Sequence, residues 1–372
     1  MKVFHLAGKP YKRGQEYGEH FKDTICELVA QDRMELEREI QARTGMTLSD
    51  EDWLSMVRRY LVFAEDYAPD LVEEMRGIAN GAGISFEHLF AFNAFLDFND
   101  LSSRPLTSKL LIGCTTFAAS STATREGDAY LGQTYDWRTS YRKGSTILHH
   151  TGPNGISVLL FTFAGLLGCA GINSAGMGIV INKLTPSDSR PGVPHPFVLR
   201  KALEQTNIPD AIGMIGNCER ASGIFYLLAD ASGEIIGIET TATDFEVIYA
   251  MEDYLGHSNH YVHPRLLDYD QPNRRLKTDT FVRWSRINKL LERARGQIGL
   301  DDLMEFTRDH ASSPHSICLH PVTKRHDGVE GNDDIYTSST NAGMIMDLKS
   351  LKFWVSLGNP CISKYEEYGF PG

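Results

Sequence analysis

Residues 110–118, LLIGCTTFA, mark the point where the sequence changes from helical to strand-like patterning. Before them, segments such as TICELVAQDRMELEREIQA repeat apolar residues every three to four positions, which is typical of amphipathic helices. After them come short β-rich runs such as AYLGQTYDW, SVLLFTFAG and GIFYLLAD, separated by turn residues. Further helical segments interrupt these runs in blocks rather than after every strand. The sequence therefore predicts an α+β fold of layered sheets and helices.

The composition excludes several kinds of partner. The chain has 372 residues, 42% of them hydrophobic, and a formal net charge of −11. This charge argues against nucleic acid as a partner. The chain contains no run of about 18 apolar residues and no signal-peptide pattern, so we expect a cytoplasmic protein without a membrane partner. The sequence leaves open whether the chain forms a homo-oligomer.

The cysteines are widely spread and form no CxxC pair, which predicts reduced thiols rather than disulfides. They are Cys26, Cys114, Cys169, Cys218, Cys318 and Cys361. Taken alone, Cys114 is most simply an inert core thiol, because free cysteine is among the most buried residue types. Its neighbour Gly113 offers a second interpretation, since glycine lets the backbone bend and leaves its carbonyl uncovered.

A thiol beside an uncovered carbonyl can attack it and cut the chain. Cys114 would then become a new N-terminus, with an α-amine whose reference pKa is about 7.7–8.0. Such an amine can act as the general base for the side chain beside it.

Two further segments contain polar residues that could support a nucleophile. In GQTYDW, residues 132–137, strand alternation puts Gln133 and Tyr135 on one face and Asp136 on the other. Asp136 could orient the nucleophile's amine, or it could cap a turn. In AGINSAGMGIVIN, Asn173 fits a hairpin turn, and the alternative is an amide directed at a ligand.

The segment GHSNHYVHP contains His257, His260 and His263 around Asn259. Three imidazoles can bind zinc, so a metal-dependent hydrolase that uses these histidines is an alternative function. Neither an extended strand nor a helix broken at Pro264 would bring the three rings together easily. Asn259 could instead donate its side-chain amide to an oxyanion.

Another histidine-rich segment, HASSPHSICLHP, contains His310, His315 and His320 together with Ser316 and Cys318. No GxSxG motif supports a serine triad there, so we interpret the segment as a solvated loop. The glycine-rich stretches GAGISFEHL and GLLGCAG match neither a P-loop nor a dinucleotide-binding fingerprint. We therefore expect no cofactor and no bound metal.

Seven motifs in order resemble the autoproteolytic penicillin acyltransferase-like (acyl-coenzyme A:isopenicillin N acyltransferase) family of N-terminal nucleophile hydrolases. They are GKPYKRGQEYGE, EEMRGIANGAGIS, GCTTFA, GQTYDW, AGLLGCAGINSAGMGIVIN, RPGVPHPFVLRKALE and HSNHYVHP. The resemblance implies a four-layer αββα sandwich with a helical pro-segment. It also implies self-cleavage between Gly113 and Cys114, with residues 1–113 staying bound as a small chain beside the catalytic chain 114–372.

The resemblance also implies roles for individual residues. The Cys114 thiol would attack an amide or thioester carbonyl of a small N-acyl compound and form an acyl-thioester. Asp136 would orient the amine or the thiol, and Asn259 would donate to the tetrahedral oxyanion. Gln133 is similar to the acyltransferase branch, since the bile-salt hydrolase branch has arginine there.

Substrate-binding candidates come from the same resemblance and from the aromatic residues near Cys114. Asn173 matches a position that lines the site in the bile-salt hydrolase branch, and Tyr135, Trp137 and Phe117 are candidate pocket residues. Many relatives carry arginine after SIC, whereas Leu319 stands here, which points to a different substrate preference.

Three functions therefore remain open besides the metal-dependent one. With water as acceptor the enzyme would hydrolyse amides, and with an amine it would transfer the acyl group. The second case includes an acyl-coenzyme A-dependent N-acyltransferase of the penicillin type, although no coenzyme A cradle is recognisable. A binding protein that keeps the fold but not the cleavage is the third.

Overall fold

The computed structural model describes residues 1, 3–45, 47–100, 113–152, 154–270, 278–321 and 338–371; residues 110–112 of LLIGCTTFA lie outside them. Its helices are α1 (Pro10–His20), α2 (Lys22–Thr44), α3 (Asp50–Tyr67), α4 (Pro69–Ala82), α5 (Phe86–Asn93), α6 (Phe95–Asp100), η1 (Thr139–Gly144), α7 (His195–Leu203), α8 (Ile208–Gly216), η2 (Pro264–Asp270), α9 (Asp279–Ala294) and α10 (Leu300–Thr307). Its strands are β1 (Val3–Leu6), β2 (Cys114–Ala119), β3 (Tyr130–Arg138), β4 (Ser145–Thr151), β5 (Ser157–Phe163), β6 (Ala170–Asn173), β7 (Met177–Lys183), β8 (Ile224–Asp230), β9 (Ile235–Thr240), β10 (Phe245–Tyr249), β11 (Tyr254–His257), β12 (Ser338–Asp347), β13 (Lys352–Leu357) and β14 (Tyr365–Gly369).

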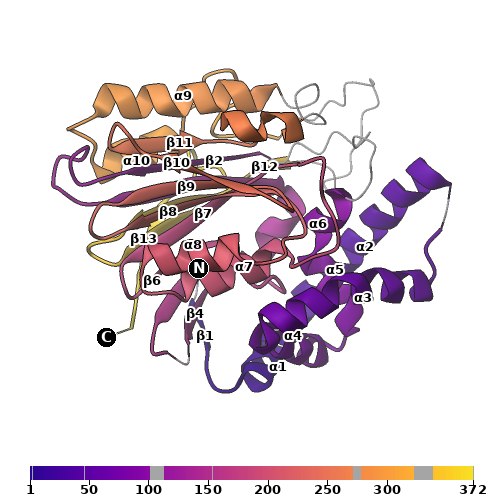
Figure 1. Ribbon diagram of the computed structural model, residues 1–372. Helices are drawn as coiled ribbons and strands as arrows, with labels where there is room; N and C mark the ends of the chain where they lie inside the picture. The colour runs from indigo at the N-terminus through magenta and orange to yellow at the C-terminus, as the bar shows by residue number, and fades with distance from the viewer. Residues whose placement is uncertain are drawn as a thin grey trace.

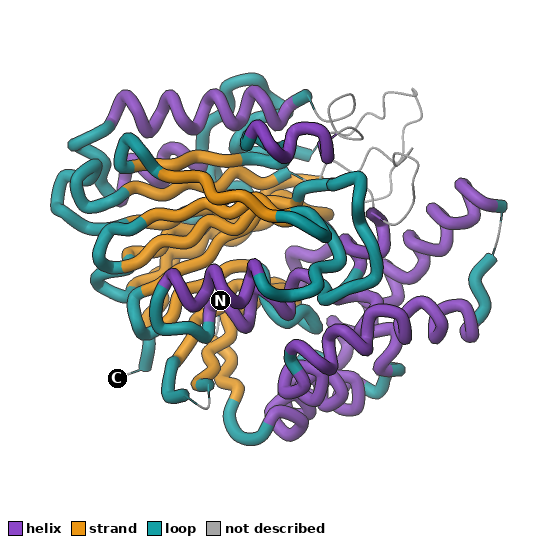
Figure 2. Tube along the Cα trace, viewed as in Figure 1, coloured by secondary structure: helices purple, strands orange, loops and turns teal. Residues whose placement is uncertain are grey.

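The strands form two sheets that stack face to face (Figure 1). One sheet has the order β1-β4-β5-β6-β7-β8-β9-β10 and the other β11-β2-β3-β12-β13-β14. Helices α9 and α10 cover the outer face of the second sheet, and α7 and α8 cover the first (Figure 2). The predicted four-layer αββα sandwich is therefore confirmed. No helix in the described part of the chain is long and apolar enough to cross a bilayer.

The helices before the sandwich pack closely because glycines from two of them face each other. A Cβ atom on Gly14 or Gly18 of α1 would lie about 2 Å from a carbonyl oxygen of α4, at 2.0 Å and 2.2 Å respectively. Gly77 and Gly81 of α4 meet carbonyl oxygens of α1 at 2.0 Å and 2.1 Å in the same way. Helices α1 and α4 therefore pack against each other through the glycines of two motifs, GKPYKRGQEYGE on α1 and EEMRGIANGAGIS on α4.

We expect Gly77→Ala to lower the free energy of unfolding by about 3 kcal/mol, because the new methyl group would force α1 and α4 apart. Urea denaturation followed by circular dichroism measures this. Gly213→Ala on α8 is the matched control, since the nearest neighbour of its new Cβ atom would be the Asn217 side chain at 3.8 Å. Helix propensity there favours alanine by about 0.8–1 kcal/mol. Equal losses in the two variants would contradict the close-packing explanation.

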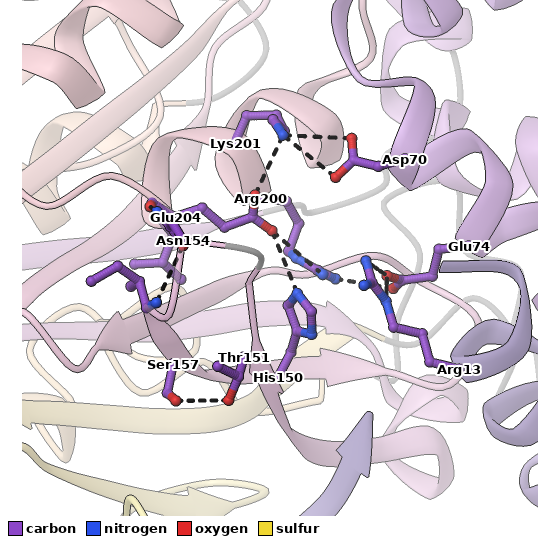
Figure 3. A network of polar contacts seen from close by, with 12 residues as sticks. Arg13, Asp70, Glu74, His150, Thr151, Asn154, Ser157, Arg200, Lys201 and Glu204 are labelled. Atoms are coloured by element: carbon purple, nitrogen blue, oxygen red, sulfur yellow. Dashed lines mark hydrogen bonds and ion pairs between the residues drawn. The ribbon is translucent and has the colours of Figure 1, made fainter. Parts of the chain in front are cut away.

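Buried ion pairs connect the N-terminal helices α1 and α4 to α7 of the sandwich, as Figure 3 shows. Glu74 of α4 pairs with Arg13 of α1 at 2.6 Å and with Arg200 of α7 at 3.3 Å. Burial opposes ionisation of Glu74, but Arg200 and Arg13 together hold its pKa below the ordinary range. Close by, Lys201 of α7 pairs with Asp70 of α4 at 3.5 Å.

A second group of charges joins α2 to the end of β3. The side chain of Arg138 is fully buried and forms ion pairs with Asp32 and with Glu35, the latter at 2.9 Å. Farther along, His195 of α7 lies 3.2 Å from the carboxylate of Asp97 on α6. Removing one partner of such a buried pair typically costs about 3–5 kcal/mol, because the other charge stays buried without a partner. These contacts therefore oppose separation of the two parts of the chain.

Candidate active site

The peptide bond between Gly113 and Cys114 is held at both ends. Cys114 begins β2 and is only 5% exposed. Its N–H donates to Asn259 Oδ1 at 2.7 Å, while the Gly113 carbonyl accepts from the Asp136 N–H at 3.0 Å. A Cβ atom on Gly113 would lie 3.0 Å from Arg283 Nη2 and 3.1 Å from Asp136 Oδ2. Glycine therefore leaves the room that these two side chains occupy.

The Cys114 thiol needs a base before it can react. Burial, reinforced by the charge of Asp136, raises its pKa to about 12. Hydrogen bonding from the Asp136 N–H, the charge of Arg283 and the side chain of Gln133 act in the opposite direction but do not offset burial. In the uncut chain the sulfur is thus a neutral thiol at neutral pH.

Asp136 has the properties of that base. Its Oδ1 accepts a hydrogen bond from Thr340 Oγ1 at 2.6 Å, on the neighbouring strand β12. Its Oδ2 is buried and has no hydrogen-bond partner among the described residues. Burial raises the pKa of Asp136 to about 7, although Arg283 and Thr340 favour the charged form. A free carboxylate oxygen that titrates near neutrality therefore lies beside Gly113.

Arg283 of α9 is the site residue that the sequence analysis missed. Its Nη1 donates to the Cys114 carbonyl at 2.7 Å and to Ser258 Oγ at 2.6 Å. Its Nη2 donates to Asn259 Oδ1 at 3.1 Å and to Asp279 Oδ2 at 3.0 Å. In RWSRINKLLERARG it is one cation among several on an amphipathic helix, so only the three-dimensional packing distinguishes it.

Leu319, where many relatives were expected to carry arginine, is buried and has a backbone role. Its N–H donates to Thr340 Oγ1 at 2.8 Å, and its carbonyl accepts from the Thr340 N–H at 2.9 Å. Leu319 thus helps to hold the threonine that bonds Asp136. The guanidinium next to Cys114 comes from Arg283 on α9 instead.

Asn259 uses its amide to hold the backbone of Cys114. Its Oδ1 accepts from the Cys114 N–H, and its Nδ2 donates to the Lys183 carbonyl at 3.0 Å. The two partners fix the orientation of the amide, because an N–H needs an acceptor and a carbonyl needs a donor. Nδ2 carries a second hydrogen, and donation from it to an oxyanion stays a prediction.

Polar neighbours of Cys114 on β2 and β3 connect the site to α9 and to the other sheet. Thr115 Oγ1 accepts from Arg283 Nη1 at 3.2 Å, and Thr116 Oγ1 donates to Asn182 of the other sheet at 2.7 Å. Gln133 also reaches the other sheet, donating to the Ile181 carbonyl at 2.8 Å and accepting from its N–H at 3.4 Å. An arginine at position 133 could not accept that second hydrogen bond.

The histidines of GHSNHYVHP do not form a metal site. His257 Nε2 lies 2.9 Å from Glu239, and His260 Nδ1 lies 3.0 Å from Thr280 Oγ1. The ring of His263 faces a different carboxylate. Among the described residues, these three imidazoles do not gather into one ligand set. The structure therefore contradicts the alternative of a metal-dependent hydrolase that uses them.

Tyr135 and Trp137 line a pocket between the N-terminal helices and the sandwich. Tyr135 is the cross-strand partner of Cys114. Phe92 and Phe95 also contribute to the wall of this pocket. Residues that precede the Gly113–Cys114 bond in the sequence and residues that follow it thus form this pocket together. The lining of the pocket is mainly aromatic and apolar.

Phe117 is not a pocket residue, contrary to expectation. It is fully buried in a small core cluster with Ile287 and Leu291 of α9. Cys114 belongs instead to the large core cluster. The two residues are three apart on β2, and strand alternation therefore puts their side chains on opposite faces.

Asn173 is also wrong as a ligand-binding residue, because its side chain holds a turn. Its Nδ2 donates to the carbonyls of Leu203 and Gln205 at 2.8 and 2.7 Å. Its Oδ1 accepts from the N–H groups of Ala175 and Met177, both at 3.0 Å. These four bonds use the full capacity of an amide, which confirms the turn interpretation.

Comparison with known proteins gives consistent relatives. A family model described as acyl-coenzyme A:6-aminopenicillanic acid acyl-transferase matches residues 123–360. The 40 kDa form of acyl-coenzyme A:6-aminopenicillanic-acid-acyltransferase from Emericella nidulans is 25% identical over 302 residues, which cover 78% of this chain and 76% of that protein.

Solved structures resemble the chain more distantly. Penicillin V acylase from Agrobacterium tumefaciens has a TM-score of 0.45 and 13% identity, covering 66% of this chain and 83% of its own. A mutant of conjugated bile acid hydrolase from Clostridium perfringens has a TM-score of 0.43 and 11% identity, covering 69% of this chain and 97% of its own.

Proposed function

Because this chain belongs to the acyl-coenzyme A:6-aminopenicillanic acid acyl-transferase family, we propose that it is a self-processing cysteine enzyme that acts on the amide bond of a small N-acyl compound. The reaction passes through an acyl-thioester on Cys114. The observation that carries the proposal is the environment of the Gly113–Cys114 bond. Asp136 and Asn259 bond the carbonyl and the N–H of this peptide group, and Arg283 bonds both Asn259 and the carbonyl of Cys114.

The first reaction is cleavage of the chain by its own thiol. Asp136 takes the thiol proton, and the sulfur attacks the Gly113 carbonyl carbon. The Asp136 N–H, which already bonds that carbonyl oxygen, stabilises the negative charge that develops on it. The C–N bond breaks, and the nitrogen of Cys114 leaves with the proton from Asp136. Water then hydrolyses the thioester, which frees the Gly113 carboxylate and the thiol.

The second reaction uses the amine that cleavage releases. Asn259 Oδ1, which accepts the N–H of Cys114 in the uncut chain, is an acceptor for this amine afterwards. The amine takes the thiol proton as the sulfur attacks the substrate carbonyl, and it returns the proton to the leaving group. Water completes hydrolysis of the resulting acyl-thioester, and an amine acceptor would complete acyl transfer. The uncut chain is then a zymogen.

Residues 1–113 remain bound to 114–372 after cleavage. Two buried ion pairs support this, because each joins a residue of 1–113 to a residue of 114–372. They are Arg138 with Asp32 and Arg200 with Glu74. The pocket supports it too, since its wall includes Phe92 from the first part and Tyr135 from the second. Its aromatic lining favours an apolar acyl group. A cytoplasmic location belongs to the proposal, because none of the six cysteines forms a disulfide.

Mass spectrometry of the purified protein tests the proposal. We expect two chains, 1–113 and 114–372, in place of one chain of 41.6 kDa. Incubating the cleaved protein with N-acyl amides and β-lactams should then produce an acyl adduct on Cys114. A chain that stays intact after prolonged incubation at mildly alkaline pH would contradict self-processing. Transfer to added amines in preference to water would favour the acyltransferase reaction over hydrolysis.

The pH dependence of cleavage should report on Asp136. Below a pKa of about 7 this carboxyl is protonated and cannot take the thiol proton, and above it the carboxylate can. The cleavage rate should therefore rise with pH through about 7, measured by gel densitometry on freshly refolded precursor. Asp136→Asn should slow cleavage by at least about 100-fold, whereas Asp128→Asn, just before the same strand, should not. A profile that stays flat from acidic to alkaline pH would refute Asp136 as the base.

A further inference from the structure

Four side chains outside the active site form a compact group that the proposed reaction does not use. They are His310, Cys318, His320 and Cys361. His310, Cys318 and His320 lie in the loop that follows α10, and Cys361 lies in the loop that follows β13. One nitrogen or sulfur atom from each lies within 4.8 Å of those of the other three. Cys318 is buried, the histidine at 310 is exposed, and the other two are half-buried.

The spacings among the two sulfurs and the His320 nitrogen are close to those of a tetrahedral zinc site, and a ring nitrogen of His310 lies within 4.8 Å of each sulfur. Zinc lies about 2.3 Å from sulfur and about 2.0–2.1 Å from nitrogen. At tetrahedral angles this separates two sulfurs by about 3.8 Å, two nitrogens by about 3.3 Å and sulfur from nitrogen by about 3.6 Å. The sulfurs of Cys318 and Cys361 are 3.7 Å apart, and the Nε2 atoms of His310 and His320 are 3.0 Å apart. His320 Nε2 lies 3.7 Å from the first sulfur and 3.2 Å from the second.

We propose that His310, Cys318, His320 and Cys361 bind one zinc ion in a closed, structural site. Two thiolates and two imidazoles are a ligand set that favours zinc over magnesium or calcium. With four protein ligands, the ion keeps no open position for substrate or water, so this site differs in kind from a catalytic metal centre. The side chain of Asn359 supports the ligands from outside, since its Nδ2 lies 3.6 Å from Cys318 Sγ.

A zinc ion here would join two loops beside the active site, the one after α10 and the one after β13. The ligands Cys318 and His320 flank Leu319, whose backbone bonds Thr340, and that threonine donates to Asp136. The loops also share hydrogen bonds, because the Arg308 guanidinium donates to the Pro360 carbonyl at 3.1 Å. Metal binding would therefore stabilise the fold and fix the segment that positions Thr340.

The rival interpretation is a disulfide between Cys318 and Cys361. A disulfide requires sulfurs about 2.05 Å apart, whereas these are separated by 3.7 Å. A disulfide would also leave the two imidazole nitrogens without a reason to converge on the sulfurs. A disulfide would involve two of the four groups, whereas a shared cation would involve all four.

Metal analysis of the full-length protein tests the proposal. The protein is purified without chelator, loaded with zinc and desalted. Inductively coupled plasma mass spectrometry should then find one zinc ion per chain. Cobalt(II) in place of zinc should give the strong visible absorption of a tetrahedral site and a near-ultraviolet band from thiolate. Removing the metal with a strong chelator should lower the melting temperature. Less than about one tenth of an ion per chain, or iron in place of zinc, would overturn the assignment.

Two single variants and two controls make the test specific. His310→Ala and Cys361→Ser should each lose the cobalt spectrum and retain little zinc after desalting. Because His310 is exposed, its variant should still fold, as circular dichroism will show. His315→Ala, from the same loop, and Cys218→Ser should bind zinc as the parent does. Zinc retained by both ligand variants, or a Cys318–Cys361 disulfide in protein handled without oxygen, would refute the site.

Discussion

Cys114→Ala is expected to leave the chain uncut and to abolish its acyl-transfer chemistry. The variant lacks the sulfur that attacks both Gly113 and the substrate, and loss of a nucleophile typically lowers kcat by at least about 10⁴-fold. Alanine fits the buried position without strain, so the protein should fold. Intact mass then reports cleavage, and hydrolysis of an N-acyl amide reports activity.

Cys114→Ser tests the same assignment with a weaker nucleophile in place of the thiol. A hydroxyl is a weaker nucleophile than a thiol, so this variant should cut itself slowly and show little turnover. Cys218→Ala, which changes a half-buried thiol just after α8, should cleave and react as the parent does. A fully active Cys114→Ala protein would contradict the nucleophile assignment. A parent whose Cys114 resists thiol-directed electrophiles would favour the binding-protein alternative.

The layered fold was predictable because the sequence segregates its two periodicities. Helical patterning before Cys114 and alternating runs after it already imply sheets covered by blocks of helices. Alternation also separated Tyr135 from Asp136, and the structure agrees, with Tyr135 in the pocket and Asp136 bonded to Thr340. Which side of β2 packs against α9 was not predictable, and Phe117 was therefore expected on the wrong side of the strand.

The residues that the sequence did not reveal are those whose role depends on contacts between distant segments. Arg283 meets Cys114 only because α9 packs on β2 and β11, and nothing in its own helix distinguishes it. The ligands of the proposed zinc site have the same property, since Cys361 is distant in the sequence from Cys318. The prediction that Asn173 binds a ligand was wrong for the opposite reason. Backbone groups around a local turn take up the hydrogen bonds of its side-chain amide.

Arg283→Met should slow self-cleavage by about 100-fold or more while leaving a folded protein of lower stability. The guanidinium bonds the Cys114 carbonyl, and it also bonds the Asn259 amide that accepts the Cys114 N–H. Its loss therefore weakens the positioning of Cys114 at both its nitrogen and its carbonyl. The side chain of Asp279, which would lose its partner, is 20% exposed, so the cost in free energy of unfolding should be below the about 3–5 kcal/mol typical of a fully buried pair. Arg283→Lys keeps the charge but loses the fork of donors, and should recover only part of the rate.

The pH profile distinguishes positioning of the active site from a general loss of stability. The charge of Arg283 favours the ionised form of Asp136, so its removal should raise the pKa of that carboxyl further above its present value of about 7. The pH at which cleavage reaches half its maximal rate should therefore move upward in Arg283→Met and stay in place in Arg283→Lys.

Arg286→Met is the matched control. Arg286 lies on the next turn of α9, and this variant removes its partly exposed ion pair with Asp309. Such a pair contributes about 0–1 kcal/mol, and its loss should move neither the rate nor the midpoint. If Arg283→Met cleaves slowly but keeps the parent's midpoint, Arg283 acts on the shape of the site and not on the charge of Asp136.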